Sequence, residues 1–180
     1  MNNYEYIITS LPDITTGWKF GEKTPEDYIE EITSLCSEKD KAAIAFLLEG
    51  FDDSKLAPEF YISAITHKNR FIREYFLFDL NVRNAKVKYL NNALGRAADK
   101  DVMSFGEETP EAVLDAVAAE FEEAPALEAV FDLGDILARE RGIDDLMWDK
   151  ISSLTTFHYF DIEVILGFVA KLNIVARWFR

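Results

Sequence analysis

The chain has 180 residues, of which 49% are hydrophobic and 13% aromatic, and this is enough for one domain with a substantial core. Its 19 Lys and Arg residues stand against 33 Asp and Glu residues, giving a formal net charge of −14. This balance excludes a general binder of nucleic acid or of an anionic membrane surface, because phosphate recognition needs an excess of Lys and Arg.

Cysteine usage and the N-terminal sequence both bear on the cellular compartment. Cys36 is the only cysteine, so the chain can form neither an internal disulfide nor a cysteine-based zinc site. The first residues lack a basic region followed by a long apolar run, and no secretory signal is predicted. We expect a cytoplasmic protein, or one held on the inner face of the cell membrane through its partners.

The first predicted elements lie before residue 50. Residues 4–10 are β-prone and predict either a short strand or the opening turns of a helix, because periodicity cannot decide over seven residues. Thr24 followed by Pro25 is a strong helix start, since Thr24 can cap and Pro25 suits the first helical position. Ser37 and Asp40 predict a second helix that ends near Gly50. We expect these two helices to form an antiparallel hairpin.

The middle of the chain predicts one long helix. From Phe60 to Leu94 there is neither glycine nor proline, and apolar residues recur at helical spacing. The helix is either continuous or broken near residues 67–69. A polar connector is predicted over residues 97–108.

Thr109 and Pro110 repeat the earlier start signal, and Pro125 is expected to break the helix that follows. A further helix is predicted from about Ala126 to Arg141, with Gly142 as its terminator. Another helix follows from about residue 144.

The last predicted helix begins near Asp161 and contains the most apolar stretch of the chain, residues 162–179. Glu163, Lys171 and Arg177 interrupt this stretch, so a transmembrane span is not predicted. The helix reaches residue 180 without a capping signal. We therefore expect an all-α fold, a bundle of about six to eight helices around one long central helix. A single domain covers residues 1–180, either as a whole protein or as the N-terminal part of a longer one.

No motif of a common catalytic site is present. The sequence lacks a phosphate-binding loop, a dinucleotide-binding glycine pattern and the nucleophile elbow of hydrolases. His67 and His158 are the only histidines and lie far apart, so a structural role is expected for both. We predict no metal, no cofactor and no enzymatic activity. A metal hydrolase with a carboxylate-based site stays open as an alternative.

Charge is segregated along the chain. Residues 67–100 are mainly basic, whereas residues 101–149 are acidic apart from Arg139 and Arg141. Either the two regions pack together and partly neutralise each other, or the basic helix docks an acidic partner. The residues chosen as partner contacts are Arg70, Arg73, Arg83, Lys86 and Lys88, with Trp178 and Phe179 at the end of the chain. Reversing Arg83 and Lys86 to Glu is expected to weaken assembly and to leave the fold intact.

Three segments resemble an uncharacterised bacterial family whose genes lie among those of V/A-type ATPase subunits. These are residues 4–13 (YEYIITSLPD), residues 78–84 (FDLNVRN) followed by 90–96 (LNNALGR), and residues 161–178 with the run VAKLNI. That family resembles the ATPase subunit called C, or d in eukaryotic enzymes, an all-helical adaptor between the central stalk and the membrane rotor ring.

The resemblance implies a non-catalytic component or accessory of a proton- or sodium-transporting ATPase. Its partners would be other ATPase subunits of the central stalk and rotor ring, without nucleic acid and without ATP binding. A stand-alone helical adaptor or regulatory protein stays open as the alternative.

Overall fold

The computed structural model describes residues 3–179, and every regular element in this range is helical. The all-α class predicted from the sequence is confirmed, with nine α-helices and one short 3-10 turn over the described residues. The helices are α1 (Glu5–Ile8), α2 (Pro25–Ser34), α3 (Glu38–Glu49), α4 (Pro58–Ile65), α5 (Arg70–Ala93), α6 (Glu111–Ala118), α7 (Ala124–Phe131), α8 (Ile136–Thr155) and α9 (Ile162–Phe179). None of the helices within residues 3–179 is long and apolar enough to cross a membrane.

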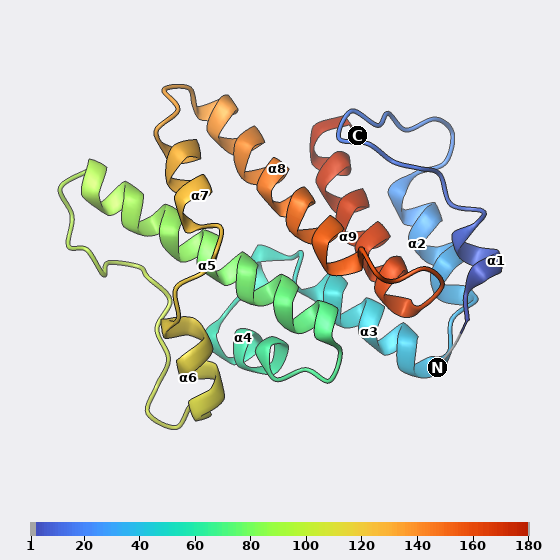
Figure 1. Ribbon diagram of the computed structural model, residues 1–180, viewed down its shortest axis with the longest axis horizontal. Coiled ribbons are helices and arrows are strands. Elements are labelled where there is room, and N and C mark those ends of the chain that lie inside the picture. Colours follow the sequence, from blue (N-terminus) through green and yellow to red (C-terminus); the bar gives the residue numbers. More distant parts are fainter. Residues whose placement is uncertain (1–2, 180) are drawn as a thin grey trace. The chain divides into compact units, whose positions relative to one another are not determined.

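The chain, treated as one domain in the sequence prediction, divides into two compact units. Unit 1 contains residues 3–53 and 148–179, and unit 2 contains residues 54–147. Unit 2 is therefore inserted between the two segments of unit 1. Figure 1 shows the ribbon with its helices labelled.

Unit 1 is built on α2, α3 and α9, and α9 packs against both of the others. The start of α2 carries the predicted cap. The Thr24 hydroxyl accepts a bond from the Asp27 amide at 3.2 Å, and the Asp27 carboxylate accepts one from the Thr24 amide at 2.8 Å. The Ser37 hydroxyl accepts from the Asp40 amide at 3.3 Å and caps α3 in the same way. These bonds satisfy amides that the first helical turns leave without partners.

The segment around Tyr4 is helical and contains no strand, which settles the alternative that the sequence leaves open. It forms the single turn α1, and Tyr4 is buried beside it. The Tyr4 hydroxyl donates to a carboxylate oxygen of the buried Asp40 at 2.5 Å and accepts from the Ser37 amide at 3.1 Å. Burial and the Asp40 contact raise the pKa of Tyr4. These bonds fix the N-terminal segment on α3, which periodicity alone cannot reveal.

Unit 2 is organised around the 24-residue helix α5, which packs against α4, α6 and α7 (Figure 1). Of the two alternatives that the sequence leaves open, a continuous helix or a break near residues 67–69, the structure has the break, because α4 ends at Ile65 and α5 begins at Arg70. The Asn69 side chain caps α5 by accepting from the Ile72 amide at 3.1 Å. The Phe60 and Phe76 rings meet edge to face at 5.1 Å and join α4 to α5.

Two boundaries predicted for α6 are wrong. The N-cap is Pro110, not Thr109, and no side chain caps the helix. The helix ends at Ala118, and Pro125 lies in the first turn of α7, where a proline needs no amide hydrogen. The Thr109 hydroxyl is instead buried and has no hydrogen-bond partner within the described part of the chain.

Replacing Thr109 with valine is expected to raise the free energy of unfolding by about 1 kcal/mol, because valine keeps the shape and removes a buried hydroxyl without a partner. Urea denaturation of both proteins measures the difference. Thr24→Val is the control. It removes a capping acceptor and should lower the free energy of unfolding by roughly 1 kcal/mol. A valine at residue 109 that destabilises the protein would show that its hydroxyl has a partner in solution.

The helix end predicted at Gly142 is also wrong. The break lies earlier, at residues 132–135, and α8 begins with the Asp135 carboxylate accepting from the Ala138 amide at 3.1 Å. Gly142 lies inside α8. A Cβ atom there would lie 2.8 Å from Cγ1 of Val130 on α7, closer than carbon atoms normally approach. Gly142 therefore permits close packing of α7 on α8 and does not terminate a helix.

Candidate partner-binding groove

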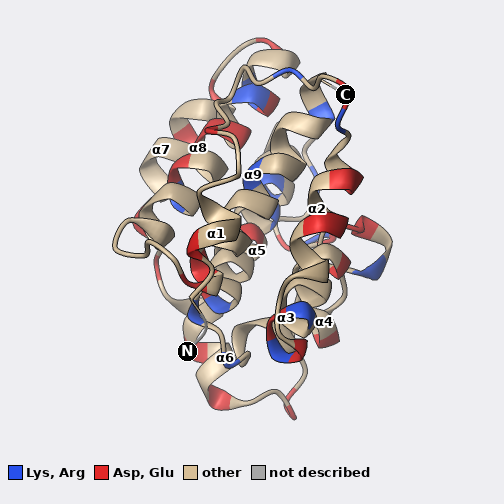
Figure 2. Ribbon diagram, turned by 90° about the vertical axis from the view of Figure 1, so that its right-hand side faces the viewer, with Lys and Arg blue, Asp and Glu red and all other residues tan. Residues whose placement is uncertain are grey.

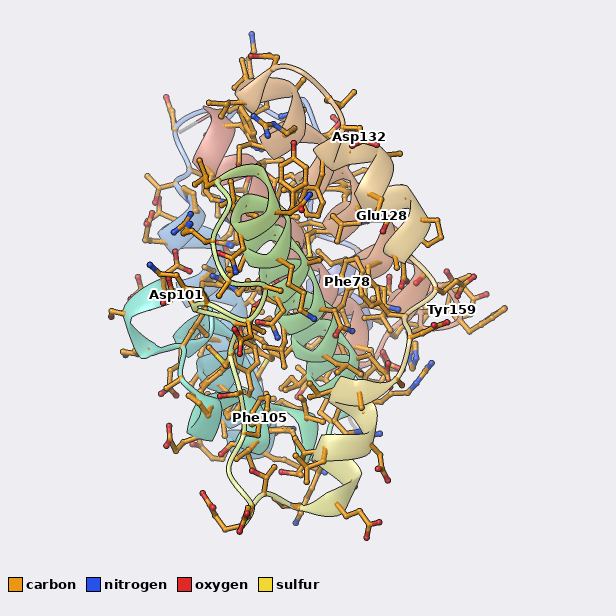
Figure 3. The ribbon with its side chains drawn as sticks, turned by 90° about the vertical axis from the view of Figure 1, so that its left-hand side faces the viewer. Phe78, Asp101, Phe105, Glu128, Asp132 and Tyr159 are labelled. Carbon is orange, nitrogen blue, oxygen red and sulfur yellow. The ribbon has the colours of Figure 1, made fainter. Side chains whose placement is uncertain are left out.

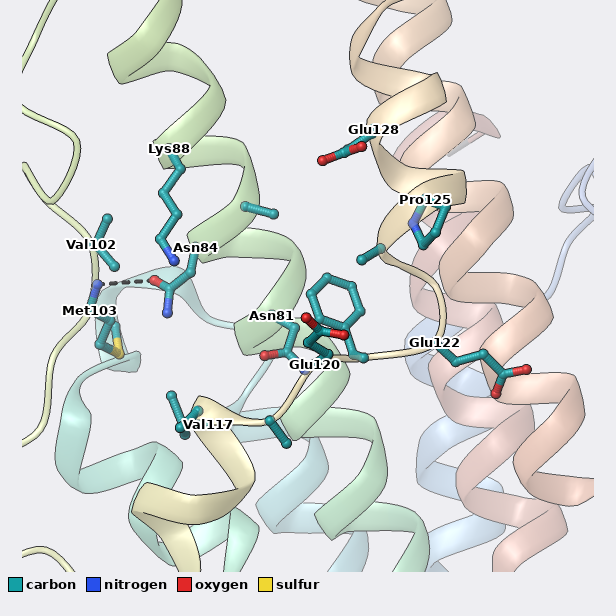
Figure 4. Close-up of a pocket in the computed structure, with 15 residues that line it drawn as sticks. Asn81, Asn84, Lys88, Val102, Met103, Val117, Glu120, Glu122, Pro125 and Glu128 are labelled. Carbon is teal, nitrogen blue, oxygen red and sulfur yellow. Dashed lines mark hydrogen bonds between the residues drawn. The ribbon is translucent and has the colours of Figure 1, made fainter.

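A groove of about 930 Å³ opens on the surface of unit 2 (Figure 4). One wall is the middle of α5, a second is the connector between α5 and α6, and the third is the segment that joins α6 to α7. The residues that line it are Asn81, Asn84, Ala85, Lys88, Val102, Met103, 117–122, Ala124, Pro125 and Glu128. We name this surface the α5 groove.

The α5 wall presents a row of polar side chains. Asn81, Asn84 and Lys88 are spaced by three and four residues, so they share one face of the helix. Lys88 is exposed, whereas both asparagines are half-buried. The Asn84 amide oxygen accepts a hydrogen bond from the backbone amide of Met103 at 3.0 Å, drawn as a dashed line in Figure 4. This bond attaches the connector wall to the helix wall.

A third asparagine on the same face, Asn91, also bonds to the connector. Asn91 lies seven residues after Asn84 and is only 1% exposed. Its side-chain amide donates to the carbonyl of Ala98 at 3.2 Å and to that of Lys100 at 2.7 Å. The next residue, Asp101, has φ of 61°, a left-handed conformation that a residue other than glycine adopts only when its surroundings enforce it. The two asparagines thus fix a connector that has no regular structure of its own.

The opposite wall is apolar at its base and acidic at its rim. Phe121 meets Phe78 of α5 edge to face at 6.5 Å, which closes the base. Glu120, Glu122 and Glu128 are exposed along the rim. Figure 3 shows Asp101 and Phe105 of the connector on one side of α5, and Glu128 of α7 and Asp132, which follows α7, on the other.

The groove therefore combines amides and one cation on α5 with carboxylates on the facing wall. Its lining contains no histidine, cysteine, serine or threonine, and its ionisable side chains are Lys88 and the three glutamates of the rim. Amide and charged groups around an apolar base are suited to binding a polypeptide segment.

Three of the five basic residues predicted as partner contacts bond within unit 2. The Arg83 guanidinium donates to Asp79 at 2.8 Å, and the Lys86 ammonium pairs with Glu140 of α8 at 2.6 Å. Arg73 donates to the backbone carbonyls of His67 and Lys68 at 2.8 and 3.0 Å, and so closes the bend between α4 and α5. The Lys86 pair shows that the basic helix and the acidic region do pack together, as one of the two interpretations predicts.

Arg83 is part of a partly buried network. The fully buried Tyr61 donates to the same Asp79 oxygen at 2.7 Å. Burial, together with the Asp79 carboxylate, raises the pKa of Tyr61, which stays a donor at neutral pH. Glutamate at residue 83 would place a second carboxylate beside Asp79. The double reversal expected from the sequence to leave the fold intact would therefore disturb packing, and it is a poor test of assembly.

The remaining predicted contacts are distributed over both units. Arg70 and Lys88 are exposed on α5, and only Lys88 lines the groove. Trp178 and Phe179 lie at the end of α9 in unit 1 and are half-buried. The sequence prediction did not identify Asn84 and Asn91 as anchors of the connector. Their seven-residue spacing on one helix face was the available signal.

Neither histidine belongs to a cluster of ligands. His67 lies in the bend between α4 and α5, where its Nδ1 accepts from the Asn69 amide at 2.9 Å, and burial lowers its pKa. His158 contacts Asp161 at 2.6 Å between α8 and α9. Over residues 3–179, no group of three or more His, Cys, Asp or Glu side chains is placed to hold a metal ion.

Comparison with known proteins gives one match. A family model described as "Protein of unknown function (DUF2764)" matches residues 51–180. The chain belongs to this family. No curated protein and no solved structure matches the chain. The DUF2764 match spans all of unit 2, including every residue of the α5 groove, together with the C-terminal segment of unit 1. Helices α2 and α3 precede it.

Proposed function

We propose that this protein is a non-catalytic component or accessory of a bacterial V/A-type ATPase and that it helps to couple or assemble the stalk and the membrane rotor. It would act in the cytoplasm, at the inner face of the membrane, through protein contacts alone. The α5 groove would bind a segment of another ATPase subunit.

The observation that supports this proposal is the position of the groove. Its α5 wall contains Asn81 and Asn84, which belong to the segment that resembles the ATPase-associated family, and the anchoring Asn91 belongs to the next such segment. The groove also offers amides and charges around an apolar base, a composition suited to binding a polypeptide segment.

Lys88→Glu is expected to reduce the recovery of ATPase subunits on the tagged protein about tenfold, which corresponds to roughly 1.4 kcal/mol. Lys88 is exposed on the groove wall, and its reversal leaves only carboxylates as charged groups there. The measurement is co-purification from the native organism, with each ATPase subunit quantified by mass spectrometry. Lys39→Glu is the matched control, an exposed lysine of α3 in unit 1.

The experiment tests the proposed function and the proposed binding site separately. If the wild-type protein recovers no ATPase subunit, the proposed function is wrong, and recovery of unrelated proteins would favour a stand-alone adaptor. If the wild-type protein recovers ATPase subunits and Lys88→Glu recovers as much, the function holds and the α5 groove is not the contact. Equal losses in both variants would indicate a general effect of charge.

A further inference from the structure

Unit 1 carries a second groove, which lies outside the α5 groove and is more apolar. It has a volume of about 840 Å³ and is formed by α2, α3 and α9. Its apolar lining consists of Pro25, Ile29, Leu48, Phe51, Leu172 and Ala176. We name it the α2 groove.

The α2 wall has a regular pattern along the helix. Pro25, Ile29 and Thr33 recur every four residues and form one row of the lining. The four-residue spacing also places Glu26, Glu30 and Ser34 in a second, parallel row. The rows extend over residues 25–34, about 14 Å of helix at 1.5 Å per residue. The first row is apolar at Pro25 and Ile29 and lies beside the polar row, an arrangement that matches the side of an amphipathic helix lying in the groove.

The charge of the α2 wall indicates which kind of partner fits the α2 groove. The charged residues of α2 that line the groove are Glu26 and Glu30, the helix contains no Lys or Arg, and Figure 2 shows red along it. One cation lines the groove, Lys41 of α3, and its ammonium pairs with Glu38 at 3.2 Å. A partner helix with Lys or Arg along one flank is therefore complementary to this wall. A second copy of the chain is disfavoured by its net charge of −14.

We propose that the α2 groove binds an amphipathic helix of another protein, with an apolar face in the groove and Lys or Arg residues along the flank that faces α2. The apolar face covers Ile29, Leu48 and Ala176, which line the groove and are half-buried, and the basic flank lies beside Glu26 and Glu30. This inference does not depend on the ATPase assignment, because it concerns another groove, in the other unit.

Two designed peptides of about 18 residues, or five helical turns, test the proposal. Both carry leucine along one face; one has lysine and the other glutamate on the flanks. The lysine peptide is expected to bind the full-length protein at least tenfold more tightly at low salt, measured by fluorescence anisotropy. The preference should shrink as salt screens the charges. Equal affinities, or a preference for the glutamate peptide, would overturn the proposal.

Glu30→Lys is expected to weaken binding of the lysine peptide about fivefold and to strengthen binding of the glutamate peptide, because Glu30 lies on the rim. The matched control is Glu22→Lys, an exposed residue of unit 1 that does not line the groove and that should change neither affinity. If both variants change the affinities equally, the net charge and not the groove determines binding, and the proposal is wrong.

Ala176→Trp tests the apolar face, since this small side chain lines the groove and an indole would fill the space. We expect binding of the lysine peptide to fall at least tenfold while the helical circular dichroism is retained. Peptide binding that survives in this folded variant would contradict the site. Sedimentation of the wild-type protein examines the other occupant: a dimer that Ala176→Trp dissociates would assign the groove to a second copy and overturn the proposal.

Discussion

Asn91→Ala is expected to lower the free energy of unfolding by about 2–3 kcal/mol and to loosen one wall of the α5 groove. The side chain is 1% exposed and donates to two backbone carbonyls of the connector, at Ala98 and Lys100. Alanine removes both bonds and leaves a cavity in a packed region. Without these bonds, Asp101 loses the restraint on its left-handed conformation, and the connector can relax away from α5.

Two measurements check this expectation. Urea denaturation gives the change in free energy, and hydrogen exchange reports the Met103 amide, which donates to Asn84. Asn92→Ala is the matched control, because Asn92 is the exposed neighbour of Asn91 on the same helix. A loss that is equal in both variants would mean that the side chain of Asn91 does not anchor the connector.

Asn91→Asp refines the same test. Aspartate keeps the size of the side chain but presents an acceptor to two carbonyl oxygens. At neutral pH it should destabilise the protein at least as much as alanine does, because a buried charge then faces two acceptors. Protonation would restore one donor, so the deficit relative to the wild-type protein should shrink as the pH falls through the raised pKa that a buried carboxyl acquires.

Gly142→Leu is expected to lower the free energy of unfolding by about 2–3 kcal/mol, although leucine is a better helix former than glycine. Gly142 lies inside α8, and even a Cβ atom there would come within 2.8 Å of Val130 on α7. The leucine must push α7 away from α8, and the packing of unit 2 around Phe131 and Leu127 is lost with it. Urea denaturation measures the loss.

A second substitution tests whether contact with Val130 causes the destabilisation of Gly142→Leu. Val130→Ala removes the two methyl groups that crowd residue 142, so it should recover part of the loss in Gly142→Leu while slightly destabilising the wild-type protein. The double-mutant cycle should thus give a favourable coupling of about 1 kcal/mol or more. Additive losses would show that Val130 is not the obstacle.

The sequence was most informative where a helix start depends on neighbouring residues. Thr24 and Ser37 each cap a helix with their own side chains, and local capping chemistry was enough to predict the starts of α2 and α3. Such bonds join residues three positions apart, so no knowledge of the tertiary structure is needed.

Local reasoning failed where tertiary contacts decide. Glycine normally signals a helix end, but at Gly142 the absence of a side chain serves contact with Val130. Likewise, Thr109 looked like a cap, yet it is buried, and its hydroxyl faces no acceptor within residues 3–179. The α5 groove forms only where the connector, the start of α7 and the middle of α5 pack near one another. The periodicity of a single segment does not predict such packing.

The insertion of unit 2 between the segments of unit 1 imposes an order on biosynthesis. Unit 2 is contiguous in sequence, so it can fold as soon as residues 54–147 have left the ribosome. Unit 1 must wait for α9, and joining its two segments across an unfolded loop of about 100 residues would cost on the order of 4 kcal/mol. Prior folding of the insert replaces that loop with a fixed body. A nascent chain therefore acquires the α5 groove first, and the α2 groove exists only once translation has reached Leu172 and Ala176.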